Sequence, residues 1–223
     1  MSDAQALRPR INERQLRVDL AAACRLASRL DWQEAVANHF SVATSADGRY
    51  FLMNPLWRHF SRLRASDFLL LDAHTDTAHN ALLLDPTAWS CLADPQIKPI
   101  DQTSARFYNR VAIDTHYGGI ADNAAEGLRL TRALGEHSVL MMGNHGVVTV
   151  GDTVAETFDA LYHLERACRT LLLAHSTGQP LRLLSDEIAE RTALSWEDGG
   201  AQAAAHFSQQ KAILDAEDGS YAE

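Results

Sequence analysis

The sequence predicts an α/β protein, and three observations support this fold class. Apolar residues recur at helical steps in the region after Asn12 and again in the region after Thr153. Several short runs rich in leucine or valine lie between these regions and are bounded by turn residues, as strands are. The stretch 139–151, VLMMGNHGVVTVG, joins two such runs through Gly-Asn-His-Gly. Helices at both ends of the chain with short strands between them indicate an α/β or α+β sandwich.

The composition narrows the class of protein. The 223 residues are enough for one domain or at most two, and the hydrophobic fraction of 46% is enough for a sizeable core. A formal net charge of −9 disfavours broad binding to nucleic acid or to anionic membranes. Cys24, Cys91 and Cys168 are widely spaced, which favours a reducing compartment. The sequence has no signal-like or membrane-length apolar run, so we expect a soluble, cytoplasmic protein.

The first predicted element is a long helix. We expect residues 1–11 to form a flexible leader and residues 12–223 to form a single domain with a helical C-terminal tail. Asn12 is a suitable N-cap because its short side chain can accept a hydrogen bond from the first helical turn. Apolar residues then follow at steps of three and four, so we predict a helix that ends at about Leu30.

A β-hairpin is predicted after this helix. The segments 38–44 and 49–54 are rich in strand-forming residues and are separated by a Ser-Ala-Asp-Gly turn. Pro55 ends the second strand because proline cannot donate to a strand ladder. The run Phe-Leu-Leu-Leu-Asp at 68–72 predicts another short buried strand, and the polar segment 73–88 is expected to be a loop.

The middle of the chain mixes strand, turn and helix patterns. It allows a strand or turn at 97–100, a short helix at 103–108 and a strand at 111–113. A helix over about 122–134 then ends with Gly135 as its C′ residue. Thr153 followed three residues later by glutamate is a capping-box pattern that begins the longest predicted helix. The predicted bounds of this helix and of the two that follow are 154–175, 186–194 and 201–214.

The Gly-Asn-His-Gly turn is the first candidate site. Gly143 and Gly146 allow a sharp bend without a Cβ penalty, so His145 is held between two buried strands. A histidine held in this way suits a fixed metal ligand or base, and it also suits a turn in which it only makes hydrogen bonds. His116, which lies beside glycines at a strand end, is a second candidate. Of the other histidines, His39 lies in a predicted strand and His59, His74 and His79 lie in loop-like sequence. The positions of His137, His163, His175 and His206 are those of helix surfaces or helix ends.

Several further motifs follow one another in a definite order. They are EAVANHFSVA (34–43), YFLMNP (50–55), RASDFLLLD (64–72), DPTAW (85–89), PIDQTSARFYNRVA (99–112), YGG (117–119) and GNHGVVTVGDTVAETFDALYHLERAC (143–168). In this order they resemble the class II aldolase/adducin family, in its bacterial-type, single-domain form. The resemblance implies a three-layer α/β/α sandwich around a largely antiparallel central sheet. It also implies a homo-oligomer, a tetramer or a dimer, with sites near subunit boundaries.

The resemblance implies an enzyme with a divalent metal, which in this family is commonly zinc. Family enzymes hold this metal with two histidines of an HxH strand and with the histidine of the NHG turn, and the metal stabilises an enediolate. By position, His145 is the implied metal ligand, Asn38 a substrate-binding residue and Tyr117 a catalytic residue. The implied function is that of a metal-dependent aldolase, lyase or epimerase acting on a small, sugar-like hydroxy-carbonyl substrate, with no nucleic-acid or membrane partner. The segment 53–56 replaces the Ser/Thr-Gly turn of sugar-phosphate aldolases, which favours a substrate without phosphate.

The chain departs from the family pattern between Ser90 and Cys91. After DPTAW the family continues with a helix and with the strand that carries HxH, whereas here the chain runs directly into CLADP. About thirty residues are absent, which is enough for one helix and one strand. Two of the three expected histidines are absent with them, so the implied metal site is incomplete.

Two explanations of this gap are open. Either the chain lacks the segment, and is then inactive or recruits substitute ligands such as His116 or His79, or a mobile segment is missing from the printed sequence. Loss of a central strand removes ladder bonds and packing partners, which favours the second explanation. The alternative to a lyase is a catalytically inactive domain of adducin type, used for self-association or protein binding.

Overall fold

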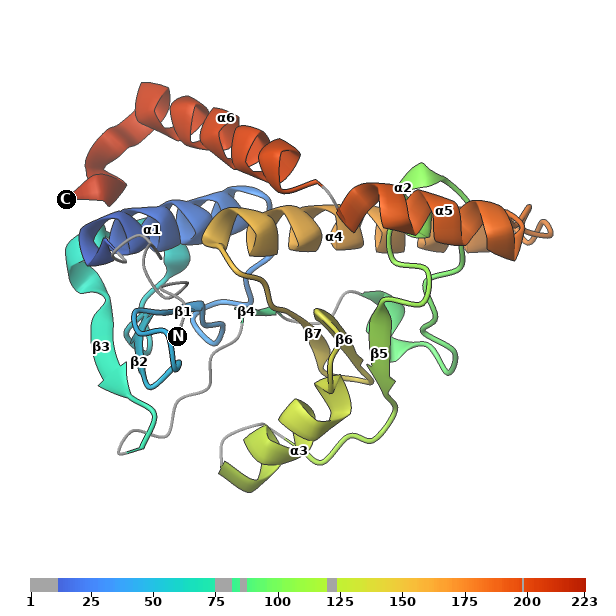
Figure 1. The fold of residues 1–223 in the computed structure, drawn as a ribbon, viewed down its shortest axis with the longest axis horizontal. Coiled ribbons are helices and arrows are strands. Elements are labelled where there is room, and N and C mark those ends of the chain that lie inside the picture. Colours follow the sequence, from blue (N-terminus) through green and yellow to red (C-terminus); the bar gives the residue numbers. More distant parts are fainter. Residues whose placement is uncertain (1–11, 75–81, 85–87, 120–123, 198) are drawn as a thin grey trace, which may run out of the picture.

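A computed structural model describes residues 12–74, 82–84, 88–119, 124–197 and 199–223. Helices α1 (Glu13–Arg29) and α4 (Val154–Ser176) lie along one side of the strands, and α3 (Ala124–Leu134) covers the opposite side of β5 and β6 (Figure 1). The predicted α/β class and its three layers are therefore confirmed. The predicted leader, residues 1–11, lies outside the described residues. No helix in the described ranges is both long and apolar enough to cross a membrane.

The first sheet is antiparallel and has the order β1-β2-β3. Its strands are β1 (Ser41–Ala43), β2 (Tyr50–Met53) and β3 (Leu69–Asp72). Two short 3₁₀ turns connect β2 to β3, η1 (Phe60–Arg62) and η2 (Ala65–Asp67). The hairpin prediction is confirmed, but the prediction that β3 is buried is wrong. Leu69 and Leu70 are each 49% exposed, because β3 pairs with β2 on one side only within the described residues.

The second sheet has the order β4-β7-β6-β5, and β5 and β6 are its parallel pair. Its strands are β4 (Leu82–Leu84), β5 (Val111–Asp114), β6 (Val139–Met142) and β7 (Gly146–Thr149). Helix α3 makes the crossover from β5 to β6 and ends at Gly135, whose φ of 57° confirms its predicted role. Residues 82–84, predicted as loop, form β4 because β7 offers them a ladder in register. The segment 97–100 forms no strand.

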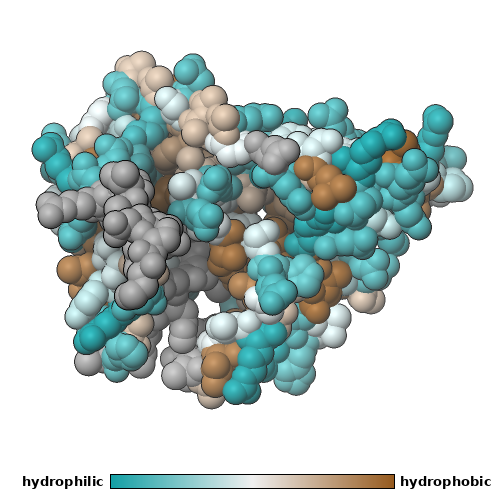
Figure 2. Space-filling model, viewed as in Figure 1, coloured by the Kyte–Doolittle hydropathy of each residue, from teal (hydrophilic) through white to brown (hydrophobic). Residues whose placement is uncertain are grey.

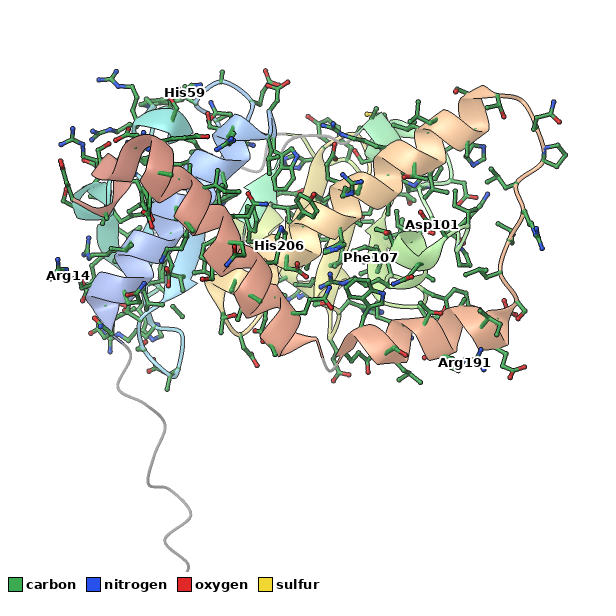
Figure 3. All side chains as sticks on the ribbon, turned by 90° about the horizontal axis from the view of Figure 1, so that it is seen from above. Arg14, His59, Asp101, Phe107, Arg191 and His206 are labelled. Carbon is green, nitrogen blue, oxygen red and sulfur yellow. The ribbon has the colours of Figure 1, made fainter. Side chains whose placement is uncertain are left out.

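The remaining α-helices lie on the same side of the strands as α1 and α4 (Figure 1). Thr153 caps α4, since its hydroxyl accepts a hydrogen bond from the Glu156 backbone N–H at 3.1 Å. Asn12 caps α1 in the same way through the Gln15 N–H, at 3.3 Å. Figures 1 and 3 show α6 lying over α1 and α4. The other elements are η3 (Ala88–Cys91), α2 (Gln102–Ala105), α5 (Asp186–Glu197), α6 (Gly200–Asp218) and η4 (Gly219–Ala222).

Most of the large buried side chains form one core. It lies between α1, α4 and the strands, and its members include Leu20, Phe40, Leu52, Trp89, Met141, Phe158 and Leu164. A smaller cluster lies between the second sheet and α3. Hydrophilic residues dominate the face in Figure 2, and the hydrophobic residues on it form separate small patches. The core therefore fixes the second sheet, whose turns carry the candidate site, against the long helices.

Candidate functional site

The Gly-Asn-His-Gly turn joins β6 and β7, whose residues are all buried. Asn144 has a left-handed φ of 59° and is exposed, and Gly146 has φ 152°, which only glycine adopts readily. At position 143, close approach of another backbone segment requires a glycine, whereas the sequence predicts that this glycine serves the bend. A Cβ there would lie 3.2 Å from the Asp114 carbonyl oxygen, so glycine lets the turn approach the end of β5. The side chain of His145 is thus presented, partly exposed, beside the loop after β5.

Tyr117 lies next to His145. The two rings have centroids 6.3 Å apart and meet edge to face, with an interplanar angle of 81°. Tyr117 is 50% exposed, so its ring is open to a ligand. The structure thus brings together the predicted metal ligand and the predicted catalytic residue, which are 28 positions apart in the sequence.

Arg129 of α3 joins the charged groups beside these rings. Its Nε lies 2.8 Å and its Nη2 2.7 Å from the two carboxylate oxygens of Glu126. Its Nη1 lies 2.7 Å from Oδ2 of the buried Asp114, an ion pair whose angle is not that of an aligned hydrogen bond. The hydrogen bond to Arg129 is the main cause that lowers the pKa of Glu126, and charge on His116 and His145 lowers it further. Both carboxylates beside the turn are therefore already paired with a cation.

The junction between Ser90 and Cys91 packs against the same turn. Both residues lie in η3, and the Leu92 N–H donates to the Trp89 carbonyl at 3.1 Å. The Asn144 N–H donates to the Ser90 carbonyl, also at 3.1 Å. The chain thus passes from DPTAW to CLADP through the short helix η3. In the family pattern the HxH strand follows at this place, whereas here η3 contacts the Gly-Asn-His-Gly turn.

The residues present do not fit the three-ligand metal that the resemblance implies. In the described ranges, no group of three His, Cys, Asp or Glu side chains is arranged so that it could hold a metal ion. His145 comes without the HxH pair, and Asp114 and Glu126 are held by Arg129. His116 forms no such group with them, and His79, the other suggested substitute, lies outside the described residues. A lone imidazole does not make a tight zinc site.

Asn38, the predicted substrate-binding residue, shapes a loop of the first sheet. It is 5% exposed, and its side-chain oxygen accepts a hydrogen bond from the Glu34 backbone N–H. Its carbonyl accepts from the Asn54 side chain at 3.3 Å, and the Asn54 side-chain oxygen accepts from the Phe40 N–H at 2.8 Å. A cavity of about 190 Å³ lies farther along this sheet, between β1 and the β7–α4 connection, and Asn38 does not line it.

Sequence reasoning missed a second polar cluster, centred on Asp159 of α4. The Asp159 side chain is 3% exposed and accepts hydrogen bonds from Arg106 and from His206, each at 2.7 Å. His163 is also in contact, with its Nδ1 2.9 Å from the Asp159 carbonyl oxygen. Burial alone raises the pKa of Asp159, but the bonds from His163, Arg106 and His206 outweigh it and bring that pKa below its usual value. The prediction that both histidines lie on the surface is wrong.

The Asp159 cluster connects four helices. His206 comes from α6 and lies between that helix and α4 (Figure 3). Arg106 follows α2, and its guanidinium also stacks on Trp196 of α5, 4.8 Å from the ring centroid. The available signal was the four-residue spacing of Asp159 and His163, which places both on one face of α4. The return of α6 over that face cannot be deduced from such a spacing.

Comparisons with known proteins agree with this fold. The family model for the class II aldolase and adducin N-terminal domain matches residues 18–86 and 84–172. A Caulobacter vibrioides protein named for class 2 aldolases is 29% identical over 205 residues, covering 80% of this chain and 79% of the relative. Rat alpha-adducin is 26% identical over 204 residues, covering 77% of this chain and 27% of adducin. The crystal structure of an aldolase II superfamily protein from Pseudomonas syringae has a TM-score of 0.85 at 27% identity, covering 98% of both chains.

The same comparisons bear on the gap that the sequence indicates near Ser90. The two matches of the family model meet at residues 84–86, immediately before η3. The Caulobacter alignment runs over 205 positions but uses 80% of 223 residues, about 178, so it passes through about 27 positions that this chain lacks. A difference of this size equals the length of roughly one helix and one strand. The chain therefore belongs to the class II aldolase and adducin family.

Proposed function

We propose that this chain is an adducin-type domain, which keeps the family fold for self-association or protein binding and lacks the three-histidine metal chemistry. One observation supports this proposal above all. His145 stands at the Gly-Asn-His-Gly turn without a second and a third ligand from the described part of the chain. The proposed protein is a homo-oligomer, a tetramer or a dimer, of the cytoplasm.

The charges around the turn support the same proposal. A zinc site needs ligands whose lone pairs are free to face the ion. Asp114 and Glu126 instead face Arg129, whose cation lies where it repels a second positive charge. Alpha-adducin is among the relatives, so the scaffold also occurs in proteins that are not named as enzymes.

Self-association and turnover test this proposal together. Light scattering of the purified chain should give a mass that is a multiple of 24.6 kDa, at concentrations where a monomer is resolved from a dimer. Turnover should be absent with hydroxy-carbonyl sugars and keto acids, with and without a phosphate group, in the presence of Zn²⁺, Co²⁺ or Mn²⁺. A monomer that turns over one of these compounds only with added metal contradicts the proposal.

A second candidate is the metal-dependent aldolase, lyase or epimerase. The contact between Tyr117 and His145 favours it, because a phenol beside an imidazole suits proton transfer to a small hydroxy-carbonyl substrate. In this function His145 holds the metal, Tyr117 moves the proton and Asn38 binds substrate. Loss of a measured turnover in both His145→Gln and Tyr117→Phe, with the fold intact, would support it over the first.

A further inference from the structure

We propose that Arg129 is the positioning residue of the Gly-Asn-His-Gly site. Its guanidinium fixes the loop that carries Tyr117, so that the tyrosine ring stays against His145 without a metal ion. That the ring stays there without a metal ion rests on the function proposed above. The role of Arg129 in fixing the loop does not.

Arg129 contacts three groups at this loop: the Asp114 carboxylate, the His116 carbonyl and the Glu126 carboxylate of α3. Its Nη1 pairs with Asp114 at the end of β5, at 2.7 Å. Its Nη2 donates to the His116 backbone carbonyl at 3.2 Å, and the Asp114 side chain accepts from the His116 N–H at 3.0 Å. Its Nε and Nη2 both donate to Glu126, one turn earlier on α3. The residue immediately before Tyr117 is therefore bound on both its N–H and its carbonyl.

The residue after Tyr117 is held through the same ion pair. A Cβ on Gly118 would lie 2.9 Å from Oε2 of Glu126, so the glutamate side chain packs directly on the Gly118 backbone. The Arg129–Glu126 pair thus contacts the chain on both sides of Tyr117. Because the Tyr117 ring is half exposed, its own burial does little to fix it. The backbone anchors on either side decide where the ring lies.

The chemistry of the guanidinium suits this role. It carries five N–H donors in one plane, enough for two carboxylates and a carbonyl at once, which an ammonium group cannot match. The hydrogen bonds to Glu126 and the contact with the Asp114 carboxylate raise the pKa of Arg129 above its usual value, so its charge is permanent. The clamp joins β5 to α3, and β6 pairs with β5 and leads into the turn that carries His145.

The matched control for Arg129 is Arg132. It lies one turn later on the same helix and is exposed. Replacing either arginine with methionine removes one cation from α3 and keeps a long, helix-forming side chain. A difference between Arg129→Met and Arg132→Met therefore reports the contacts of Arg129 and not the net charge of the helix.

The test uses NMR of the full chain labelled with ¹³C-histidine and follows the signal of the His145 imidazole. The variant His145→Gln, in which this signal is absent, assigns it. An aromatic ring at 6.3 Å shifts the imidazole protons, and Tyr117→Leu measures the size of that shift. Arg129→Met should move the His145 signal most of the way to its position in Tyr117→Leu, while Arg132→Met leaves it in place. A His145 signal that stays at the wild-type position in Arg129→Met overturns the proposal.

A second variant guards against simple unfolding of Arg129→Met. Gly118→Ala keeps Arg129 but places a Cβ against the Glu126 carboxylate, which must then turn away from the loop. It should move the His145 signal in the same direction by a smaller amount, with the His206 signal at Asp159 unchanged as a control for the fold. A Gly118→Ala protein whose His145 signal is unshifted counts against the clamp.

Addition of one equivalent of Zn²⁺ separates this inference from the proposed function. The His145 signal should not respond to the metal in wild type. A saturable response contradicts the metal-free function, while the comparison of Arg129→Met with Arg132→Met in metal-free buffer still decides the role of Arg129.

Discussion

At the scale of single residues, Trp57 has a strained, left-handed backbone. Its side chain is exposed, so no burial of the indole offsets that strain. Its φ is 62° and its side chain is 76% exposed. A left-handed backbone costs a residue with a Cβ about 1–2 kcal/mol. We expect Trp57→Gly to be more stable than Trp57→Ala by about 1 kcal/mol, because both remove the indole and only glycine relieves the strain. Urea unfolding of the two variants measures this difference, and equal stabilities contradict it.

Loss of the Asp159 carboxylate should destabilise the fold strongly. Asp159→Asn leaves Arg106 without its buried counter-charge and weakens the acceptor that His206 uses, which costs about 3 kcal/mol in comparable buried pairs. The control is Asp94→Asn, which removes the exposed ion pair to Lys98 and should cost less than about 1 kcal/mol. Chemical unfolding at neutral pH measures both. Similar losses in the two variants would refute the buried role.

The stabilisation by Asp159 should depend on pH in a defined direction. Its pKa is lowered in the folded chain by His163, Arg106 and His206, against the effect of burial. A lowered carboxyl pKa stabilises the fold above the unfolded pKa of about 4, and this contribution disappears as the pH falls below that value. The stability difference between wild type and Asp159→Asn should therefore be present at about pH 5 and shrink below about pH 4. A difference that grows on acidification has the wrong sign.

Single residues were predictable where a local motif fixes them. Asn12 and Thr153 cap helices because their side chains need only the next turn of the chain. The nearness of Tyr117 and His145 came from the family resemblance, and no spacing rule would have found it. The Asp159 cluster needs α6 to return over α4, and that depends on the whole core and not on any local pattern.

At the scale of elements, the C-terminal turn η4 is anchored like a core segment. Tyr221 is 2% exposed and its hydroxyl donates to Asp215 at 2.7 Å. The Ser66 N–H donates to the Glu223 carbonyl at 2.9 Å, so the end of the chain is tied to η2. Burial and the bond to Asp215 raise the Tyr221 pKa, so the phenol stays neutral. The segment therefore contributes to the stability of α1 and α6, which pack against it.

Truncations of Tyr221 should separate packing from hydrogen bonding. Tyr221→Ala should cost about 3 kcal/mol through the lost buried ring, and Tyr221→Phe about 1 kcal/mol through the lost hydrogen bond. Thermal or chemical unfolding measures both. If phenylalanine costs as much as alanine, the ring contributes little and the anchor is mainly polar.

Elements with their own caps and periodicity were predictable, and those that depend on a neighbour were not. Both long helices and the two hairpins follow from local patterns. Strand β4 comprises three residues between polar segments, and only its pairing with β7 makes it a strand. The exposure of Leu69 follows from the position of β3 at the edge of its sheet, which the run of leucines does not reveal.

At the scale of the whole molecule, two sheets and one core make up the family fold. The described strands form two sheets, β1-β2-β3 and β4-β7-β6-β5, and one core under α1 and α4 holds both. At η3, where the sequence predicts a missing segment, Trp89 packs into that core and the Ser90 carbonyl accepts a hydrogen bond from the Asn144 N–H.

Metal content tests the central claim, that the turn has lost its three-histidine site, most directly. The chain is purified without chelators, incubated with excess Zn²⁺, desalted and measured by mass spectrometry, and its melting temperature is recorded before and after. We predict far less than one zinc ion per chain and no shift in melting temperature, with His145→Gln giving the same values, because a lone imidazole holds zinc weakly. One tightly held ion per chain that raises the melting temperature and is lost in His145→Gln would contradict the claim.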